Sequence, residues 1–161
     1  MAEKSPDVII REARAGEQAL LIGLTLSVWD KVSVAKNITD VFGPLNGHPW
    51  TDHKADQIAA ELGKADVILV GEGGGEILAF ATLLYDRKYA TGAIGHLGVS
   101  AAAQGKGIGR KMVRECLGRM KRDGMRHARI DALVQNERAR TLYESEGFRE
   151  VGRTVHYFQQ L

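Results

Sequence analysis

The spacing of hydrophobic residues changes from strand-like to helix-like several times along this chain. Residues 8–11 have the composition of a short strand, and residues 16–28 carry a helical face made of Leu20, Leu21, Leu24 and Val28. Between residues 31 and 50 the periodicity is weak, and turn dipeptides such as Gly43-Pro44 are frequent. We therefore expect a strand, a helix and then a long irregular connection, and loops of that length are often functional.

A second helix and a hairpin follow the irregular connection. Thr51 or Asp52 can cap the helix, Gly63 can end it, and its apolar face consists of Ala55, Ile58, Ala59 and Leu62. Residues 67–70 and 77–84 are β-rich runs joined by a glycine-rich turn, which is typical of antiparallel neighbours. A third strand is expected to end over residues 94–99.

The clearest helix of the chain begins at Ile108 and ends near Gly124. Its apolar and basic residues lie on opposite faces. Residues 128–134 then alternate as a strand does, Asn136 opens a short helix that ends at Gly147, and residues 148–158 predict one or two final strands. The order of elements predicts an α/β fold of the α+β type, with a mixed, mainly antiparallel central sheet flanked by helices. No repeat or linker divides the chain, so we expect one domain over residues 1–161.

Composition excludes several classes of protein. The net charge of +2 over 161 residues is too small to indicate a nucleic-acid partner. No apolar run approaches the roughly 18 residues that a membrane-spanning helix needs, and the first residues are too polar for a secretory signal. With Cys116 as the single cysteine, we expect a cytoplasmic protein without disulfides. The five histidines have no partners at metal-ligand spacing, so we expect no metal.

The segment that carries chemistry is the glycine-rich turn between residues 104 and 109. A strand, a glycine turn and a helix N-terminus together form an anion site, because free N–H groups and the helix dipole converge there. Gly109 is followed by Arg110 and Lys111, which does not fit a P-loop, and the third glycine of a dinucleotide-binding fingerprint is missing. A plain turn that leads into a helix remains the alternative to a phosphate site.

Two motifs in this region resemble those of the GNAT superfamily of N-acetyltransferases. The first is Gln104-x-x-Gly107-x-Gly109 after a strand that ends in Leu97-x-Val99. The second is Asn136-x-x-Ala139-x-x-Leu142-Tyr143-x-x-x-Gly147-Phe148. The resemblance covers residues 94–158 closely and the rest of the chain through the order of elements alone.

The resemblance implies acetyl-CoA as cosubstrate and a set of residues that hold it. Backbone amides of residues 104–109 would bind the pyrophosphate, residues 97–99 would pair with the pantetheine arm, and Asn136 would contact that arm. Asn136 can also act as a plain helix N-cap. The implied acetyl-CoA-binding residues are Leu97, Gly98, Val99, Gln104, Gly105, Lys106, Gly107, Ile108, Gly109, Arg110 and Asn136.

Tyr143 is the residue that the resemblance implies as general acid. A phenol with an ordinary pKa of about 10 is protonated at pH 7 and can give a proton to a thiolate whose thiol has a pKa of about 8.5. Without the motif, Tyr143 would be interpreted as a core aromatic. Cys116 lies on the apolar face of its helix, so we expect a packed thiol rather than a nucleophile.

The function expected from the resemblance is direct transfer of an acetyl group from acetyl-CoA to an amine, with a small-molecule amine favoured. The alternatives are acetylation of a protein N-terminus or lysine, and a module that senses acyl-CoA without reacting. Part of residues 37–53 is expected to line the acceptor pocket. Relatives are often dimers, so a homodimer is compatible with the sequence, although no feature requires it.

The base that removes the amine proton is harder to find in the sequence. Several relatives place Glu or His two or four residues before the leucine that corresponds to Leu97, where this chain has Gly95 and Ala93. His96 is adjacent, but regular strand alternation would direct it away from the face of Gly95 and Leu97. We therefore expect His96 not to be the base, and the proton to leave through water toward a loop group such as His48 or His53.

Overall fold

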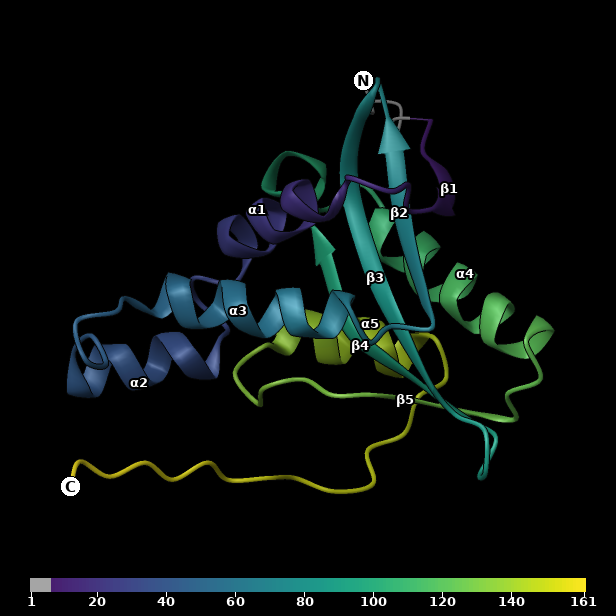
Figure 1. The fold of residues 1–161 in the computed structure, drawn as a ribbon. Coiled ribbons are helices and arrows are strands. Elements are labelled where there is room, and N and C mark those ends of the chain that lie inside the picture. Colours follow the sequence, from purple (N-terminus) through teal and green to yellow (C-terminus); the bar gives the residue numbers. More distant parts are fainter. Residues whose placement is uncertain (1–6) are drawn as a thin grey trace.

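A computed structural model describes residues 7–161 and arranges them as a central sheet with helices on both faces (Figure 1). The elements in chain order are β1 (Ile9–Glu12), α1 (Gln18–Val28), α2 (Val34–Phe42), α3 (Trp50–Leu62), β2 (Val67–Gly73), β3 (Glu76–Asp86), β4 (Thr91–Val99), a 3₁₀ turn (Ala101–Ala103), α4 (Ile108–Arg122), β5 (His127–Ile130) and α5 (Glu137–Ser145).

Among the described residues, five strands form one sheet in the order β1-β2-β3-β4-β5. The first four strands pair antiparallel, and β5 pairs parallel to β4. The predicted mixed, mainly antiparallel sheet is therefore confirmed. The predicted strand over residues 128–134 is shorter in the structure and ends at Ile130.

Helix α4 covers one face of the sheet and completes the larger part of the core. Its buried face consists of Ile108, Met112, Val113, Cys116 and Met120. These side chains pack on apolar residues of β2, β3 and β4. Burial also raises the pKa of the Cys116 thiol to about 12, so this cysteine is a packed, unreactive group, as its position in the helical pattern predicts.

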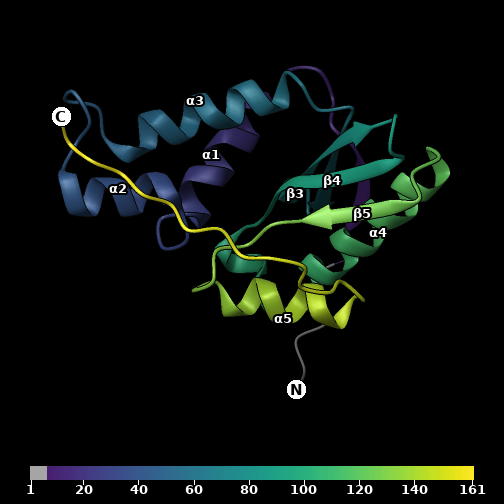
Figure 2. The ribbon, with the colours of Figure 1, turned by 90° about the horizontal axis from the view of Figure 1, so that it is seen from below.

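Helices α1 and α3 cover the opposite face, which Figure 2 shows from below. Leu21 of α1 and Ile58 of α3 are fully buried against Val70 and Phe80 of the sheet. The predicted face of α1 needs one correction, because Leu20 is largely exposed. Helix α3 starts at Trp50 after Pro49, without a side-chain cap from Thr51 or Asp52. Sheet residues between these two helical layers are therefore screened from solvent on both sides.

Residues 34–42 form a helix, so the expectation of an irregular connection over residues 31–50 is wrong for its first half. The Ser33 side chain accepts a hydrogen bond from the Lys36 backbone at 3.5 Å and begins helix α2, which ends at Gly43. Within this short segment the apolar residues do recur at helical spacing. Its apolar positions are Val34, Ala35, Ile38, Val41 and Phe42.

The structure of residues 148–158 differs more strongly from the prediction. Residues 148–158 contain no strand, and the chain after α5 runs extended toward the end of α2 (Figure 1), where Phe158 meets Phe42 with ring centroids 5.2 Å apart. Strand-like composition is not enough by itself, because an extended segment needs a neighbouring strand to satisfy its backbone groups. The prediction of one or two final strands is therefore wrong for this structure.

Candidate functional site

The sheet opens where β4 and β5 separate. Their paired register begins at Thr91 with His127 and ends at Ile94 with Ile130. Beyond this point β4 continues to Val99, paired with β3 alone, so the edge that would face β5 is left without a strand partner in the described chain. An exposed strand edge of this kind offers main-chain donors and acceptors to an extended ligand. The predicted pantetheine-binding residues Leu97, Gly98 and Val99 lie at this opening.

Gln104 fixes the turn that follows β4. Its side-chain amide donates to the Val99 carbonyl at 3.0 Å, and its side-chain oxygen accepts from Arg138 of α5 at 2.8 Å. The end of β4, the turn and α5 are therefore tied together by a single side chain. Gln104 thus has a structural role beside the phosphate-binding role that the motif predicts.

Gly105 and Gly107 allow the turn to present its backbone. Both residues have positive φ, 79° and 77°, a conformation that glycine adopts without steric cost. A Cβ on Gly107 would meet no atom within 4 Å, so the space before the start of α4 is open. Because the first N–H groups of a helix have no partner within it, this open space fits an anion such as a pyrophosphate.

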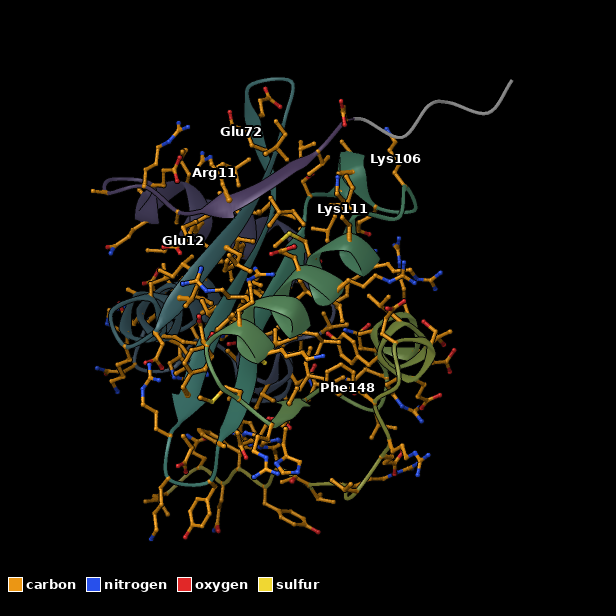
Figure 3. The ribbon with its side chains drawn as sticks, turned by 90° about the vertical axis from the view of Figure 1, so that its right-hand side faces the viewer. Arg11, Glu12, Glu72, Lys106, Lys111 and Phe148 are labelled. Atoms are coloured by element: carbon orange, nitrogen blue, oxygen red, sulfur yellow. The ribbon has the colours of Figure 1, made fainter. Side chains whose placement is uncertain are left out.

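The other residues of this turn that are predicted to bind acetyl-CoA differ in their surroundings. The Ile108 side chain is buried in the core, so only its backbone faces the turn. Gly109 lies at the contact with α5, where a Cβ would approach Leu142 to 3.4 Å. Arg110 reaches α5, with its Nε 3.0 Å from a carboxylate oxygen of Glu146. Lys106 lies on the turn itself (Figure 3).

The basic residues on the outer face of α4 contact other parts of the chain. Lys111 donates to the backbone carbonyl of Val8 beside β1, and Figure 3 shows it on the side of the helix near that strand. Arg114 pairs with Glu146 at 2.7 Å. The basic face of α4 is thus largely occupied by ion pairs and hydrogen bonds within the chain.

Helix α5 positions Asn136 and Tyr143. The Asn136 side chain accepts a hydrogen bond from the Ala139 backbone at 3.2 Å, so Asn136 is the N-cap of the helix. Burial, with a smaller contribution from Cys116, raises the pKa of Tyr143 to about 12. The phenol is therefore fully protonated at neutral pH. The role of Tyr143 as general acid stays a prediction.

A β-bulge in β4 changes the direction of His96. Between Ala81, which pairs with Leu97, and Leu83, which pairs with Ile94, β4 contains one residue more than β3. A Cβ on Gly95 would collide with the carboxylate of Glu61 in α3, and His96 contacts that same carboxylate. Both residues thus face α3, and the expectation that His96 points away from the face of Gly95 is wrong because a bulge interrupts the alternation.

His96 is the centre of a polar cluster between the sheet and α3. Its Nδ1 lies 2.7 Å from Glu61 Oε1, an ion-pair distance whose angle does not satisfy a hydrogen bond. Its Nε2 lies 3.2 Å from the ammonium of Lys54, which also donates to Gln57 at 3.1 Å. The Trp29 ring lies 4.9 Å from the imidazole centroid and 4.9 Å from the Lys54 nitrogen. The Thr82 hydroxyl donates to Glu61.

Burial and the contacts between neighbouring side chains shift the pKa values of Lys54 and Glu61. Burial lowers the pKa of Lys54, although the nearby Glu61 carboxylate opposes the shift. For Glu61, burial acts to raise the pKa, but contacts with His96 and Thr82 and the charge of Lys54 outweigh it and hold the pKa below its ordinary value. Glu61 is therefore ionised at neutral pH.

The sequence analysis missed Glu61 and Lys54 as candidate residues. Lys54, Ile58 and Glu61 follow one another at helical intervals, so all three face the sheet from α3. A charged residue on an apolar helical face is the available signal, because such a residue needs a buried partner. The partner, His96, is 35 residues or more away in sequence and only folding brings it close.

Within residues 7–161, no three His, Cys, Asp or Glu side chains gather closely enough to hold a metal ion. In the same part of the chain, no helix is long and apolar enough to span a bilayer.

One family of known proteins matches most of this chain. The model of the acetyltransferase (GNAT) family matches residues 35–148. Among curated proteins, no sequence matches this chain significantly.

Solved structures resemble the whole fold. An aminoglycoside N-acetyltransferase, AAC(6')-Iy in complex with CoA, is 16% identical and has a TM-score of 0.66 over 100% of both chains. The ribosomal-protein-S18-alanine N-acetyltransferase of Escherichia coli is 16% identical, with a TM-score of 0.69 over 90% of this chain and 79% of that one. The PaiA N-acetyltransferase of Thermoplasma acidophilum, in complex with coenzyme A, is 17% identical, with a TM-score of 0.69 over 89% and 90%.

Proposed function

Because this chain belongs to the GNAT acetyltransferase family and is an acetyl-CoA-dependent N-acetyltransferase, we propose that its acceptor is a small-molecule amine. Substrates of individual relatives do not decide this question, since the similar structures include both an aminoglycoside and a ribosomal-protein acetyltransferase. The choice therefore rests on the surroundings of the open half of β4.

The observation that carries the proposal is the enclosure of this half of the strand. Helices α1 and α3 lie over it (Figure 2), the Lys54 residue is 8% exposed, and the His96 side chain is 11% exposed. A folded protein that offers a lysine or an N-terminus needs an open surface groove, whereas a small amine needs only a narrow entrance. Within this enclosure the Trp29 ring and the ionised Glu61 lie beside the Lys54 ammonium.

Acetyl-CoA would be held on the other side of β4. The open space before α4 and the positive φ of Gly105 and Gly107 fit its pyrophosphate, with Gln104 fixing the turn and Lys106 beside it. The unpaired edge of residues 97–99 would hold the pantetheine arm, and Asn136 would contact it from α5. Acetyl-CoA supplies the activated acetyl group, which the amine attacks directly.

Tyr143 would provide the proton that the leaving thiolate takes. Its raised pKa makes it a weak acid, but it stays fully protonated and can donate to a thiolate that develops beside it. The step breaks the C–S bond, forms the C–N bond and transfers the phenolic proton to sulfur. The acceptor nitrogen loses one proton to water, and the phenolate regains one from water, so the step balances.

The test is a measurement of acetyl-CoA consumption with a panel of acceptors. Polyamines, aminoglycosides and amino acids form one arm, and lysine-containing peptides and unmodified N-terminal peptides form the other. We expect the highest kcat/KM in the first arm. A higher value for a peptide would identify a protein acetyltransferase, and consumption that no amine increases would refute the assignment of an amine acceptor.

A further inference from the structure

The enclosed side of β4 contains a buried cation that makes no ion pair. This cation is Lys54 of α3, whose ammonium lies 4.9 Å from the centroid of the Trp29 ring. We propose that the acceptor amine also carries a carboxylate, as amino acids do, and that Lys54 binds this carboxylate. The inference rests on the proposed acetylation of a small amine and names the chemical class of that amine.

The direct contacts of the Lys54 ammonium include no carboxylate. It donates to the side-chain oxygen of Gln57 at 3.1 Å and lies 3.2 Å from Nε2 of His96. Glu61 acts on Lys54 through its charge, but the Glu61 carboxylate contacts His96 and Thr82 instead. In the described part of the chain, no acidic side chain forms an ion pair with Lys54. The positive charge is therefore held without a direct anionic partner.

Other partly buried cations of this chain show what is missing around Lys54. The Arg11 side chain is 19% exposed and meets two carboxylates at 2.7 Å each. The Arg119 side chain is 24% exposed and also pairs with two carboxylates. Lys54 is 8% exposed and therefore more deeply buried than either arginine. Because a buried charge is costly unless it is paired, a carboxylate from a bound ligand would complete the surroundings of Lys54.

The position of Lys54 fits a contact with the acceptor. Lys54 lies against His96, which belongs to the half of β4 that no longer pairs with β5. The ammonium is therefore adjacent to the strand along which the acetyl group would lie. The side chains of His96 and Glu61 and the Trp29 residue are partly exposed, so the cluster is not sealed inside the core. An amino acid carries its amine and its carboxylate close together, so this one region can hold both.

The charge of Lys54 would distinguish between amines. A carboxylate that meets the ammonium forms a charge-assisted hydrogen bond, and such a bond is stronger in an enclosed site than on the surface. A hydrogen bond to a charged group changes an affinity by about 10- to 100-fold. An amine without a carboxylate would bring a second positive charge beside Lys54 and leave the lysine without an ion pair. Amino acids are therefore favoured over polyamines and other purely cationic acceptors.

The experiment compares three forms of each acceptor at saturating acetyl-CoA. They are the free acid, its amide and its decarboxylated amine, and the acids are phenylalanine, leucine, lysine and 4-aminobutyrate. In at least one set, we expect kcat/KM for the acid to exceed both counterparts by about 10- to 100-fold. The amide has a less basic amine than the acid, and the decarboxylated compound has a more basic one. A preference for the acid over both therefore cannot come from the basicity of the amine.

Substitutions of Lys54 connect the preference to this ammonium. Lys54→Met keeps an unbranched apolar chain but removes the charge, so the advantage of the acid should fall below about threefold while KM for acetyl-CoA stays unchanged. Lys54→Arg keeps the charge and should keep a preference for the acid, so the test does not depend on the methionine variant alone. The exposed Lys64 after α3 provides the matched control, and Lys64→Met should discriminate as the wild type does.

Two results would overturn the proposal. One is a wild-type protein for which no acid exceeds both of its counterparts by more than about threefold, and the other is a Lys54→Met variant that keeps the wild-type preference. A protein that acetylates none of these amines, or peptides alone, would instead contradict the proposed function. Amines that are acetylated with no advantage for any acid would contradict the carboxylate alone.

Discussion

The regions on the two sides of β4 differ in how far apart in sequence the residues that form them lie. On the side of α4, the turn over residues 104–109 follows the strand directly, and its conformation depends on nearby glycines and on Gln104. On the side of α3, the polar cluster joins Lys54 and Glu61 to His96, residues that are distant in sequence. The first region can be recognised as a motif, whereas the second exists only after folding. Mutations should therefore affect acetyl-CoA on one side and the amine on the other.

The largest expected effect is on the turn. We expect Gly107→Glu to abolish detectable acetyl-CoA binding, because a carboxylate would enter the open space before α4 and repel a pyrophosphate. The measurement is calorimetric titration with acetyl-CoA. Since Gly107 has a φ of 77°, Gly107→Asn is the control, as asparagine tolerates this conformation and adds no charge. Unchanged affinity in a folded Gly107→Glu protein would remove the assignment of the phosphate site.

The next largest effect should come from Tyr143. We expect Tyr143→Phe to lower kcat by roughly 10²- to 10⁴-fold while acetyl-CoA affinity stays within about threefold, because only the proton donor is lost. The ring itself and its contact with Phe148, with centroids 6.1 Å apart, are kept in this variant. If kcat does not change, Tyr143 is a core aromatic of α5 and the thiolate obtains its proton elsewhere.

A smaller effect is expected in the segment over residues 37–53, which we expect to line part of the acceptor pocket. Phe42→Ala at the end of α2 should raise KM for the amine about threefold to tenfold and leave KM for acetyl-CoA unchanged, a loss of roughly 1 kcal/mol in binding. Val41→Ala is the matched control, since Val41 is 75% exposed on the same helix. Equal changes in both KM values, or a change in melting temperature alone, would indicate a structural role.

The sequence predicts those parts of the fold and of the site that depend on residues close together in the chain. The glycine turn, the apolar face of α4 and the N-cap at Asn136 each depend on neighbours within a few residues, and all three are found in the structure. The bulge beside His96 depends on the pairing of β4 with β3, which a single strand does not encode. The segment 148–158 has strand composition but no partner strand.

The smallest expected effect is on the stability of the folded protein at acidic pH, to which the Glu61 carboxylate contributes. Its pKa in the folded protein is lower than the ordinary value of about 4.3 in the unfolded chain, so the folded state binds fewer protons in this range. The resulting stabilisation is fully present above the unfolded pKa and is lost as the pH falls through the lower folded pKa.

Glu61→Gln should therefore melt a few degrees below wild type at pH 7, and this difference should shrink as the pH is lowered from 5 toward 3. A hydrogen-bonded charge that is partly exposed contributes on the order of 1 kcal/mol, which corresponds to about 2–4 °C for a chain of this size. Calorimetric melting of both proteins at each pH measures the difference, and Glu144→Gln, at an exposed position of α5, corrects for the change in net charge. A difference that stays constant down to pH 3 would mean that the glutamine variant loses packing rather than charge, and that the Glu61 carboxylate does not stabilise the folded protein through its ionised form.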